Sequence, residues 1–238
     1  MVDDKRAMGG TAVAIDRSAA ASALRWWLEM GVDVAVQENP RNWLEQARAA
    51  PPSEPQPASA LPETLQEFRD WLSTDAAAPL ASVRSKPVLP VGAEGAEVML
   101  LSDPPTREEL ASGAPIGGEA AQLIARMLQA IGMADSAYSA NLACFHSPGA
   151  RLSPEQIELC ATAARRHVAL VRPKRLLILG DVPSRALLGK PLLESRGKVH
   201  KIEGVRTVAT FHPRQLLKRP SDKALAWKDL LLLTEEMP

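Results

Sequence analysis

The chain lacks the residues that mark several large classes of protein. It has only two cysteines, Cys144 and Cys160, which form no Cys-x-x-Cys pair and have no cluster of metal-ligating residues nearby, so a structural zinc is not expected. No segment approaches the roughly 20 apolar residues of a membrane span, and the start of the chain leads into no apolar run typical of a signal peptide. We therefore expect a cytoplasmic, monomeric protein with reduced thiols and no membrane association.

The chain also lacks a net charge, since Lys and Arg number 28 and Asp and Glu number 28. The distribution is uneven, however. Residues 172–228 contain 14 Lys and Arg against 4 Asp and Glu, an excess of 10 positive charges. This asymmetry favours a polyanionic partner such as a nucleic acid. The alternative is a basic surface that only faces solvent.

Composition divides the chain into four parts. Residues 1–50 form an N-terminal helical segment, in which residues 18–30 are predicted to be an amphipathic helix with Leu24, Trp27 and Leu28 on its apolar face. Residues 51–60 are a proline-rich linker. Residues 61–96 are a lead-in that is first helical and then extended. We expect the tryptophan-bearing helix to pack on the main domain, residues 97–238, with partner binding as the alternative.

The main domain alternates short apolar runs with helical patterns. An unbroken apolar run predicts a buried strand at residues 97–101, and further strands are predicted at residues 138–143, 175–179 and 205–209. Helices are predicted at residues 119–131, from Ser153 onward with a capping box, and at 184–188 and 221–235. This alternation predicts an α/β fold, a three-layer sandwich with a central four-stranded parallel sheet covered by helices on both faces.

The residues at the exits of the predicted strands are polar or small. They are Ser102-Asp103, Asn141, Gly180 and His212. In an open parallel sheet these positions lie along one edge, where such folds bind their ligands. His212-Pro213 is followed by basic residues and a leucine pair, a combination that suits a base-reading site on nucleic acid. The alternative is a hydrogen-bonded turn histidine, and we interpret His146, His167 and His200 as surface or structural residues.

Taken together, these motifs resemble those of the family-4 uracil-DNA glycosylases, over roughly three-fifths of the chain. Ser102-Asp103-Pro104-Pro105-Thr106 stands where the family has Gly-Glu-Ala-Pro-Gly, and Ile116 stands at the family's aromatic base-stacking position. Ala140-Asn141-Leu142-Ala143 stands for Thr-Asn-Val-Val, and His212-Pro213 for the family's His-Pro.

The resemblance implies a repair enzyme that flips deoxyuridine out of DNA and cleaves its N-glycosidic bond. It assigns the cationic sugar and the attacking water to the Asp103 carboxylate, and the negative charge on the leaving base to His212. It assigns uracil reading to Asn141, with Ile116 and Pro104 lining the pocket. Contacts with DNA fall to Lys198, Arg214, Leu216 and Lys218, with Leu216 as an apolar wedge. The alternative is that Leu216 and Leu217 belong to the core.

The chain departs from the family at several of these positions. The better-known members hold an iron–sulfur cluster with four cysteines, whereas here only Cys160 falls on a ligand position and Phe145 occupies another. We therefore predict no cluster, no metal and no other cofactor, with Phe145 filling the volume. Asp103 is one methylene shorter than glutamate, Ile116 cannot stack as an aromatic ring does, and Thr106 replaces a glycine.

These departures favour a second hypothesis, a catalytically weakened or inactive DNA-binding relative of the same fold. A third hypothesis is an unrelated α/β enzyme acting on a nucleotide or phosphoester, but no P-loop and no Gly-x-Gly-x-x-Gly follows any predicted strand.

Overall fold

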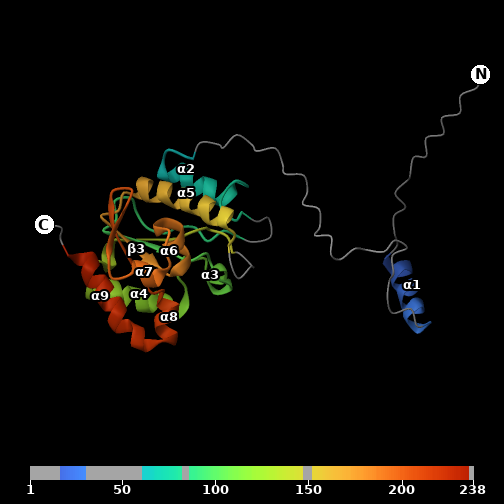
Figure 1. The fold of residues 1–238 in the computed structure, drawn as a ribbon. Helices are drawn as coiled ribbons and strands as arrows, with labels where there is room; N and C mark the ends of the chain where they lie inside the picture. Colours follow the sequence, from blue (N-terminus) through green and yellow to red (C-terminus); the bar gives the residue numbers. More distant parts are fainter. Residues whose placement is uncertain (1–16, 31–60, 82–85, 147–151, 236–238) are drawn as a thin grey trace, which may run out of the picture. The chain divides into compact units, whose positions relative to one another are not determined.

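A computed structural model of the protein describes residues 17–30, 61–81, 86–146 and 152–235 (Figure 1). The chain divides into two units, Met1–Ala58 and Ser59–Pro238. In the first unit the structure describes helix α1 (Arg17–Glu29), on which Leu24, Trp27 and Leu28 are exposed. The predicted linker lies outside the described residues. The packing of α1 on the main domain stays a prediction.

The second unit is built on a sheet of five strands in the order β2-β1-β3-β5-β4. Strands β1 (Val98–Ser102), β2 (Ala137–Asn141), β3 (Arg175–Leu179) and β5 (Val205–Thr210) are parallel. In register, Ser102 pairs with Asn141 and Leu179, and Leu179 pairs with Thr210. The parallel strands therefore end in one row, as the sequence predicts.

The prediction of four strands was wrong, because a fifth strand lies at the edge of the sheet. Strand β4 (Val199–Ile202) pairs antiparallel with β5. Its side chains are mostly exposed, so it has no unbroken apolar run to mark it. Strand β4 is joined to β5 by the two-residue turn Glu203-Gly204, whose glycine is the feature that marks a hairpin in the sequence. In the structure both turn residues have positive φ (47° and 82°). This conformation is typical of a tight β-hairpin.

Helices cover both faces of the sheet, which gives three layers (Figure 1). On one face α4 (Gly118–Ala130) and α9 (Lys223–Thr234) bury side chains against Val98 and Leu100. On the other face α5 (Pro154–Val171), α6 (Asp181–Leu188) and α7 (Leu192–Ser195) pack over Met99 and Leu101. Successive residues of β1 thus serve opposite cores, as the period of a strand requires.

The lead-in adds a further helix outside this sandwich. Helix α2 (Leu65–Thr74) begins at a capping box between Thr64 and Glu67 and packs on α5. It buries Phe68 and Leu72. Beyond it, Val91 forms an isolated antiparallel bridge with Ser139 at the outer edge of β2. In the described residues of this region, α2 is followed by turns and loops up to the start of β1.

The predicted helix ends are partly confirmed. Ser153 and Gln156 form the predicted capping box of α5. The predicted helix at residues 221–235 is α9, on which Leu230, Leu233 and Asp229 are buried and Leu225 is 39% exposed. Three short helices were not predicted from the sequence, α3 (Arg107–Ser112), α7 and α8 (Pro213–Lys218), nor were two 3-10 turns, η1 (Ala134–Ser136) and η2 (Pro220–Asp222). Among the described residues, no helix is both long and apolar enough to cross a lipid bilayer.

Candidate active site

The strand order creates a switch point between β1 and β3. The chain leaves β1 to form β2 on one side and later forms β3 on the other side. Ligands of open α/β sheets bind at the carboxyl ends of the strands at such a point. Asp103 follows β1 and Gly180 follows β3. A Cβ atom at Gly180 (φ 108°) would lie 2.7 Å from Asp103 Oδ1 and 2.9 Å from Oδ2, so only glycine admits this carboxylate.

The Asp103 carboxyl has an unusually high pKa. Burial raises its pKa to about 6, against the opposing effects of the Arg214 guanidinium and the Val182 backbone N–H. The neighbouring carboxylates of Glu109 and Asp181 add to the increase in pKa. Asp103 Oδ1 is buried and has no hydrogen-bond partner within the described part of the chain. An acid of this kind changes its charge close to neutral pH, which is a property of catalytic groups.

Asn141 joins two loops of the site. Its Nδ2 atom donates to the backbone oxygen of Asp103 at 2.8 Å and to that of Pro115 at 3.0 Å. Because both partners are carbonyl oxygens, only the nitrogen side of the amide can face them. Asn141 Oδ1 is buried, and no described residue donates to it. The amide therefore offers a ligand one acceptor and no free donor.

The residues next to these loops are those predicted to line the pocket. Ile116 follows Pro115, is 7% exposed and belongs to the core under α4. Pro104 follows Asp103 in the same loop, and His146 contacts the carbonyl oxygen of the next residue, Pro105, through Nδ1 at 2.6 Å. The loops that carry Asp103, Ile116 and Asn141 thus converge.

His212 is buried in the same place, with both ring nitrogens occupied. Its Nδ1 atom accepts the Arg214 backbone N–H at 3.1 Å, and its Nε2 atom lies 2.9 Å from Ser102 Oγ. Since Nδ1 is an acceptor, the neutral ring carries its proton on Nε2 and donates it to the hydroxyl. Burial, together with the Arg214 charge, lowers the pKa of His212 to about 3. The imidazole is therefore uncharged at neutral pH.

Arg214 was predicted to contact phosphates, but its side chain turns into the site. Nη1 lies 3.0 Å from Glu109 Oε2, and Nη2 lies 3.7 Å from Asp103 Oδ2. Glu109, whose side chain is only 2% exposed, also accepts the backbone N–H and the hydroxyl of Thr106 at 2.8 and 3.0 Å. Thr106, the replacement for the family's glycine, thereby begins helix α3.

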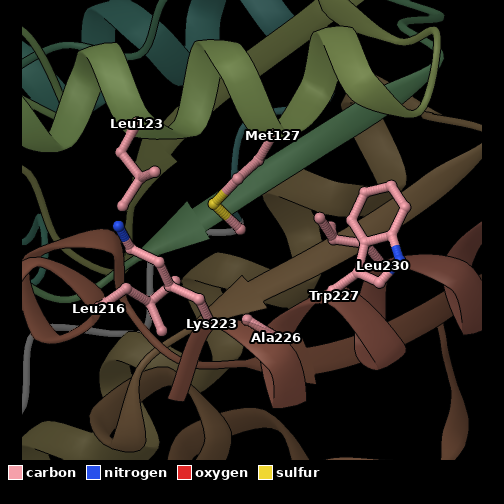
Figure 2. Close-up of a pocket in the computed structure, with 7 residues that line it drawn as sticks. All are labelled: Leu123, Met127, Leu216, Lys223, Ala226, Trp227 and Leu230. Carbon is pink, nitrogen blue, oxygen red and sulfur yellow. The ribbon is translucent and has the colours of Figure 1, made fainter. Parts of the chain in front are cut away.

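Leu216, predicted as a wedge with a core position as the alternative, lies in the core. Leu216 is 1% exposed, because it lies on the face of α8 that packs on the core. It lines an apolar cleft of about 250 Å³ between α4 and α9, shown in Figure 2, together with Leu123, Met127, Lys223, Ala226, Trp227 and Leu230. The next residue, Leu217, is 37% exposed.

The two predicted lysine contacts are at the surface. Lys218 is exposed at the end of α8. Lys198 is also exposed, and its Nζ atom donates to the Glu194 backbone oxygen at 3.1 Å. Because β4 runs antiparallel and begins at Val199 opposite Val208, Lys198 lies at the edge of the sheet where β5 ends. Both lysines are thus available on the side of the molecule that carries His212.

Comparison with known proteins agrees with this arrangement. The family model described as the uracil-DNA glycosylase superfamily matches residues 89–231, which is more than half of the chain and includes every residue discussed at the strand ends. The chain belongs to this superfamily.

Three similar relatives are named type-4 uracil-DNA glycosylases. That of Archaeoglobus fulgidus is 30% identical over 142 residues, covering 55% of this chain and 71% of the relative. That of Pyrobaculum aerophilum is 25% identical over 180 residues, covering 71% and 92%. That of Sulfurisphaera tokodaii is 23% identical over 187 residues, covering 73% and 84%. The resemblance to family 4 is confirmed.

The residues present do not fit an iron–sulfur cluster of the kind found in family 4. Such a cluster takes about four thiolates, and this chain has two cysteines. Burial raises the pKa values of Cys144 and Cys160 to about 12, so both are protonated thiols. Phe145 is 5% exposed in an apolar cluster with Phe68, Leu72 and Cys144. An aromatic ring therefore packs at a position where the family places a ligand.

Glu109 was not predicted from the sequence as part of the site. It had a sign, since Thr106 and Glu109 have the spacing of a capping box. Ser102 was placed at the ligand-binding edge but was given no role, and the structure places its hydroxyl against His212 Nε2. The remaining histidines are structural, as predicted: His167 is buried against Tyr138 Oη at 2.8 Å, and His200 contacts the Ser195 backbone oxygen at 2.7 Å.

We predict that Asp103 makes the protein less stable as the pH rises from about 4 to 6. The folded pKa of Asp103, about 6, exceeds the ordinary value of 3.8, so the folded state binds more protons than the unfolded state in this range. Asp103→Asn removes this effect. The free energy of unfolding of the variant minus that of the parent should therefore increase from pH 4 to pH 6 and then level off.

Urea unfolding at a series of pH values measures this difference. His167 and His212, whose lowered pKa values reduce stability in acid, affect both proteins alike and cancel in the difference. A difference that does not change with pH would show that Asp103 titrates normally.

Proposed function

We propose that this protein is a DNA repair glycosylase that flips deoxyuridine out of DNA and cleaves its N-glycosidic bond, without a cofactor. The observation that carries the proposal is the meeting of Asp103, Asn141 and His212 at the switch point of a superfamily sheet. Asn141 donates to the Asp103 backbone, and His212 contacts the residue before Asp103. We further propose a cytoplasmic monomer, since its two free cysteines fit a reducing compartment.

In this proposal Asp103 acts on the sugar. Cleavage leaves an oxocarbenium-like sugar and a uracil anion, and an ionised carboxylate stabilises the first of these. Asp103 Oδ1, which has no partner among the described residues, can also accept a proton from the attacking water. Because only the ionised form does this work, activity should require a pH near or above the Asp103 pKa of about 6.

His212 and Asn141 act on the base. The neutral imidazole has one donor, Nε2–H, which exchanges Ser102 Oγ for a carbonyl oxygen of uracil as negative charge develops there. Asn141 Oδ1 accepts the uracil N3–H. Cytosine has no hydrogen on N3 and would place its lone pair against this buried oxygen, which disfavours it.

The contacts with DNA differ from those expected for α8. Lys198 and Lys218 stay in the proposal as phosphate contacts, whereas Arg214 is engaged with two carboxylates. Leu217 replaces Leu216 as the apolar residue that enters the gap left by the flipped nucleotide, because it is exposed and adjoins Lys218.

Two features of the site favour the second candidate, an inactive DNA-binding relative. The Arg214 guanidinium offsets part of the Asp103 charge, and both Asn141 and His212 are at least 95% buried. A relative that binds DNA without cleaving it would keep the basic surface and lose the excision rate.

Excision from a uracil-containing oligonucleotide under single-turnover conditions separates the two candidates. We expect alkali-labile sites at uracil and none in the matched cytosine strand, at a rate that rises with pH through about 6. Asp103→Asn should lower this rate on the order of 100-fold or more while DNA binding persists. No excision by the parent protein, with salt-sensitive DNA binding retained, would establish the inactive relative instead.

The neighbouring leucines of α8 provide a matched pair of variants. Leu216→Ala should lower the free energy of unfolding by about 2–5 kcal/mol, because it empties part of the core. Leu217→Ala should change stability by less than about 0.5 kcal/mol. It should slow excision from double-stranded DNA more than from single-stranded DNA, because only the duplex must be opened. Equal slowing on both substrates would rule out Leu217 as a wedge.

A further inference from the structure

The side chains of Asp103, Glu109 and Arg214 lie together in the site. The proposed reaction uses Asp103 but gives no role to Glu109 or Arg214. Glu109 and Asp103 both face Arg214, at 3.0 and 3.7 Å. The Glu109 side chain is 2% exposed, and those of Asp103 and Arg214 are each 26% exposed. Charged groups this far from water are stable only when they are paired, so the three side chains depend on one another.

Glu109 is the fixed end of this arrangement. Its Oε2 atom accepts the Thr106 N–H and the Thr106 hydroxyl at the start of α3, and then the Arg214 Nη1–H. The Arg214 backbone is fixed as well, because its N–H is donated to His212 Nδ1. Arg214 is therefore held at its backbone by His212 and at its guanidinium by Glu109.

The contact between Arg214 and Asp103 is longer than the one with Glu109. A separation of 3.7 Å is an ion pair without a short hydrogen bond, so the carboxylate is attracted by the guanidinium and still has oxygen atoms for other partners. The other charged groups that face Asp103 are Glu109 and Asp181, which are both acidic. Asp181 is itself paired with Arg185 at 2.6 Å, so Arg214 is the cation that pairs with Asp103 and Glu109.

We propose that Glu109 and Arg214 are positioning residues: Glu109 holds the Arg214 guanidinium, and Arg214 orients the Asp103 carboxylate at the switch point and favours its charged form. Arg214 does so in the free protein, through Glu109 and His212, and not as a contact for DNA phosphates. The inference rests on the proposed function for its catalytic consequence, but the effect on Asp103 exists in the protein alone.

The test compares Arg214→Gln with Lys218→Gln, which removes the same charge from the same short helix. The first readout is the titration of Asp103 by carbon NMR of labelled aspartate carboxyls, assigned by the signal lost in Asp103→Asn. We expect Arg214→Gln to raise the titration midpoint of Asp103 by one pH unit or more, and Lys218→Gln to leave it unchanged. Glu109→Gln should release the guanidinium toward Asp103 and lower the midpoint.

The second readout is the single-turnover rate of uracil excision against pH and salt. Arg214→Gln should move the acid limb of the profile to higher pH, so that a displacement by one pH unit lowers the rate at pH 6 about fivefold. It should leave the salt dependence of DNA binding as in the parent. Lys218→Gln should reduce the salt dependence and leave the acid limb in place. In Arg214→Lys, which keeps the charge, the Asp103 midpoint should lie closer to that of the parent protein than it does in Arg214→Gln.

An Asp103 midpoint that is unchanged in Arg214→Gln, or a variant whose salt dependence falls as in Lys218→Gln, would overturn the inference. Circular dichroism checks that each variant is folded, and if Arg214→Gln is not, Arg214→Lys and Glu109→Gln carry the test. If the parent protein excises no uracil, the proposed function fails, whereas the NMR titration still decides whether Arg214 controls Asp103.

Discussion

The pairing of the Asp103 carboxylate with Arg214 is the interaction on which the site depends. A buried carboxylate strongly favours its neutral form unless a cation or hydrogen-bond donors compensate it. Here one guanidinium serves both Asp103 and Glu109, and burial still raises the pKa of Asp103 to about 6. The acid is therefore balanced between its two forms near neutral pH, which is where a group that must stabilise a cationic sugar is useful.

The fold supplies the geometry for this pairing. Parallel strands bring the residues after β1, β2, β3 and β5 to one edge. Gly180 leaves the space that the Asp103 carboxylate occupies, and Asn141 joins the Asp103 loop to Pro115. Behind His212, Asp229 accepts hydrogen bonds from Thr210 and Arg196, which fixes the end of β5 against α9. A site made from four distant segments is in this way held by few contacts.

The sequence was sufficient to predict the layers of the fold and the edge that carries the site, because buried strands such as residues 175–179 have unbroken apolar runs. It was not sufficient for β4, whose exposed residues resemble a loop. Nor could it show the direction of two side chains on α8. Leu216 and Leu217 are chemically equal in the sequence, and only the packing of the helix decides which is buried. Arg214 likewise faces inward because Glu109 lies there, and that contact spans 105 positions of the chain.

A crystal structure of Asp103→Asn bound to a uracil-containing duplex would show directly whether the strand-end site binds a flipped uracil. We expect a uracil outside the helix at the switch point, with its N3 within hydrogen-bond distance of Asn141 Oδ1. We also expect that His212 Nε2 contacts a uracil oxygen in place of Ser102 Oγ. A uracil that stays stacked in the duplex, with the contacts of Asn141 and His212 unchanged, would contradict the account.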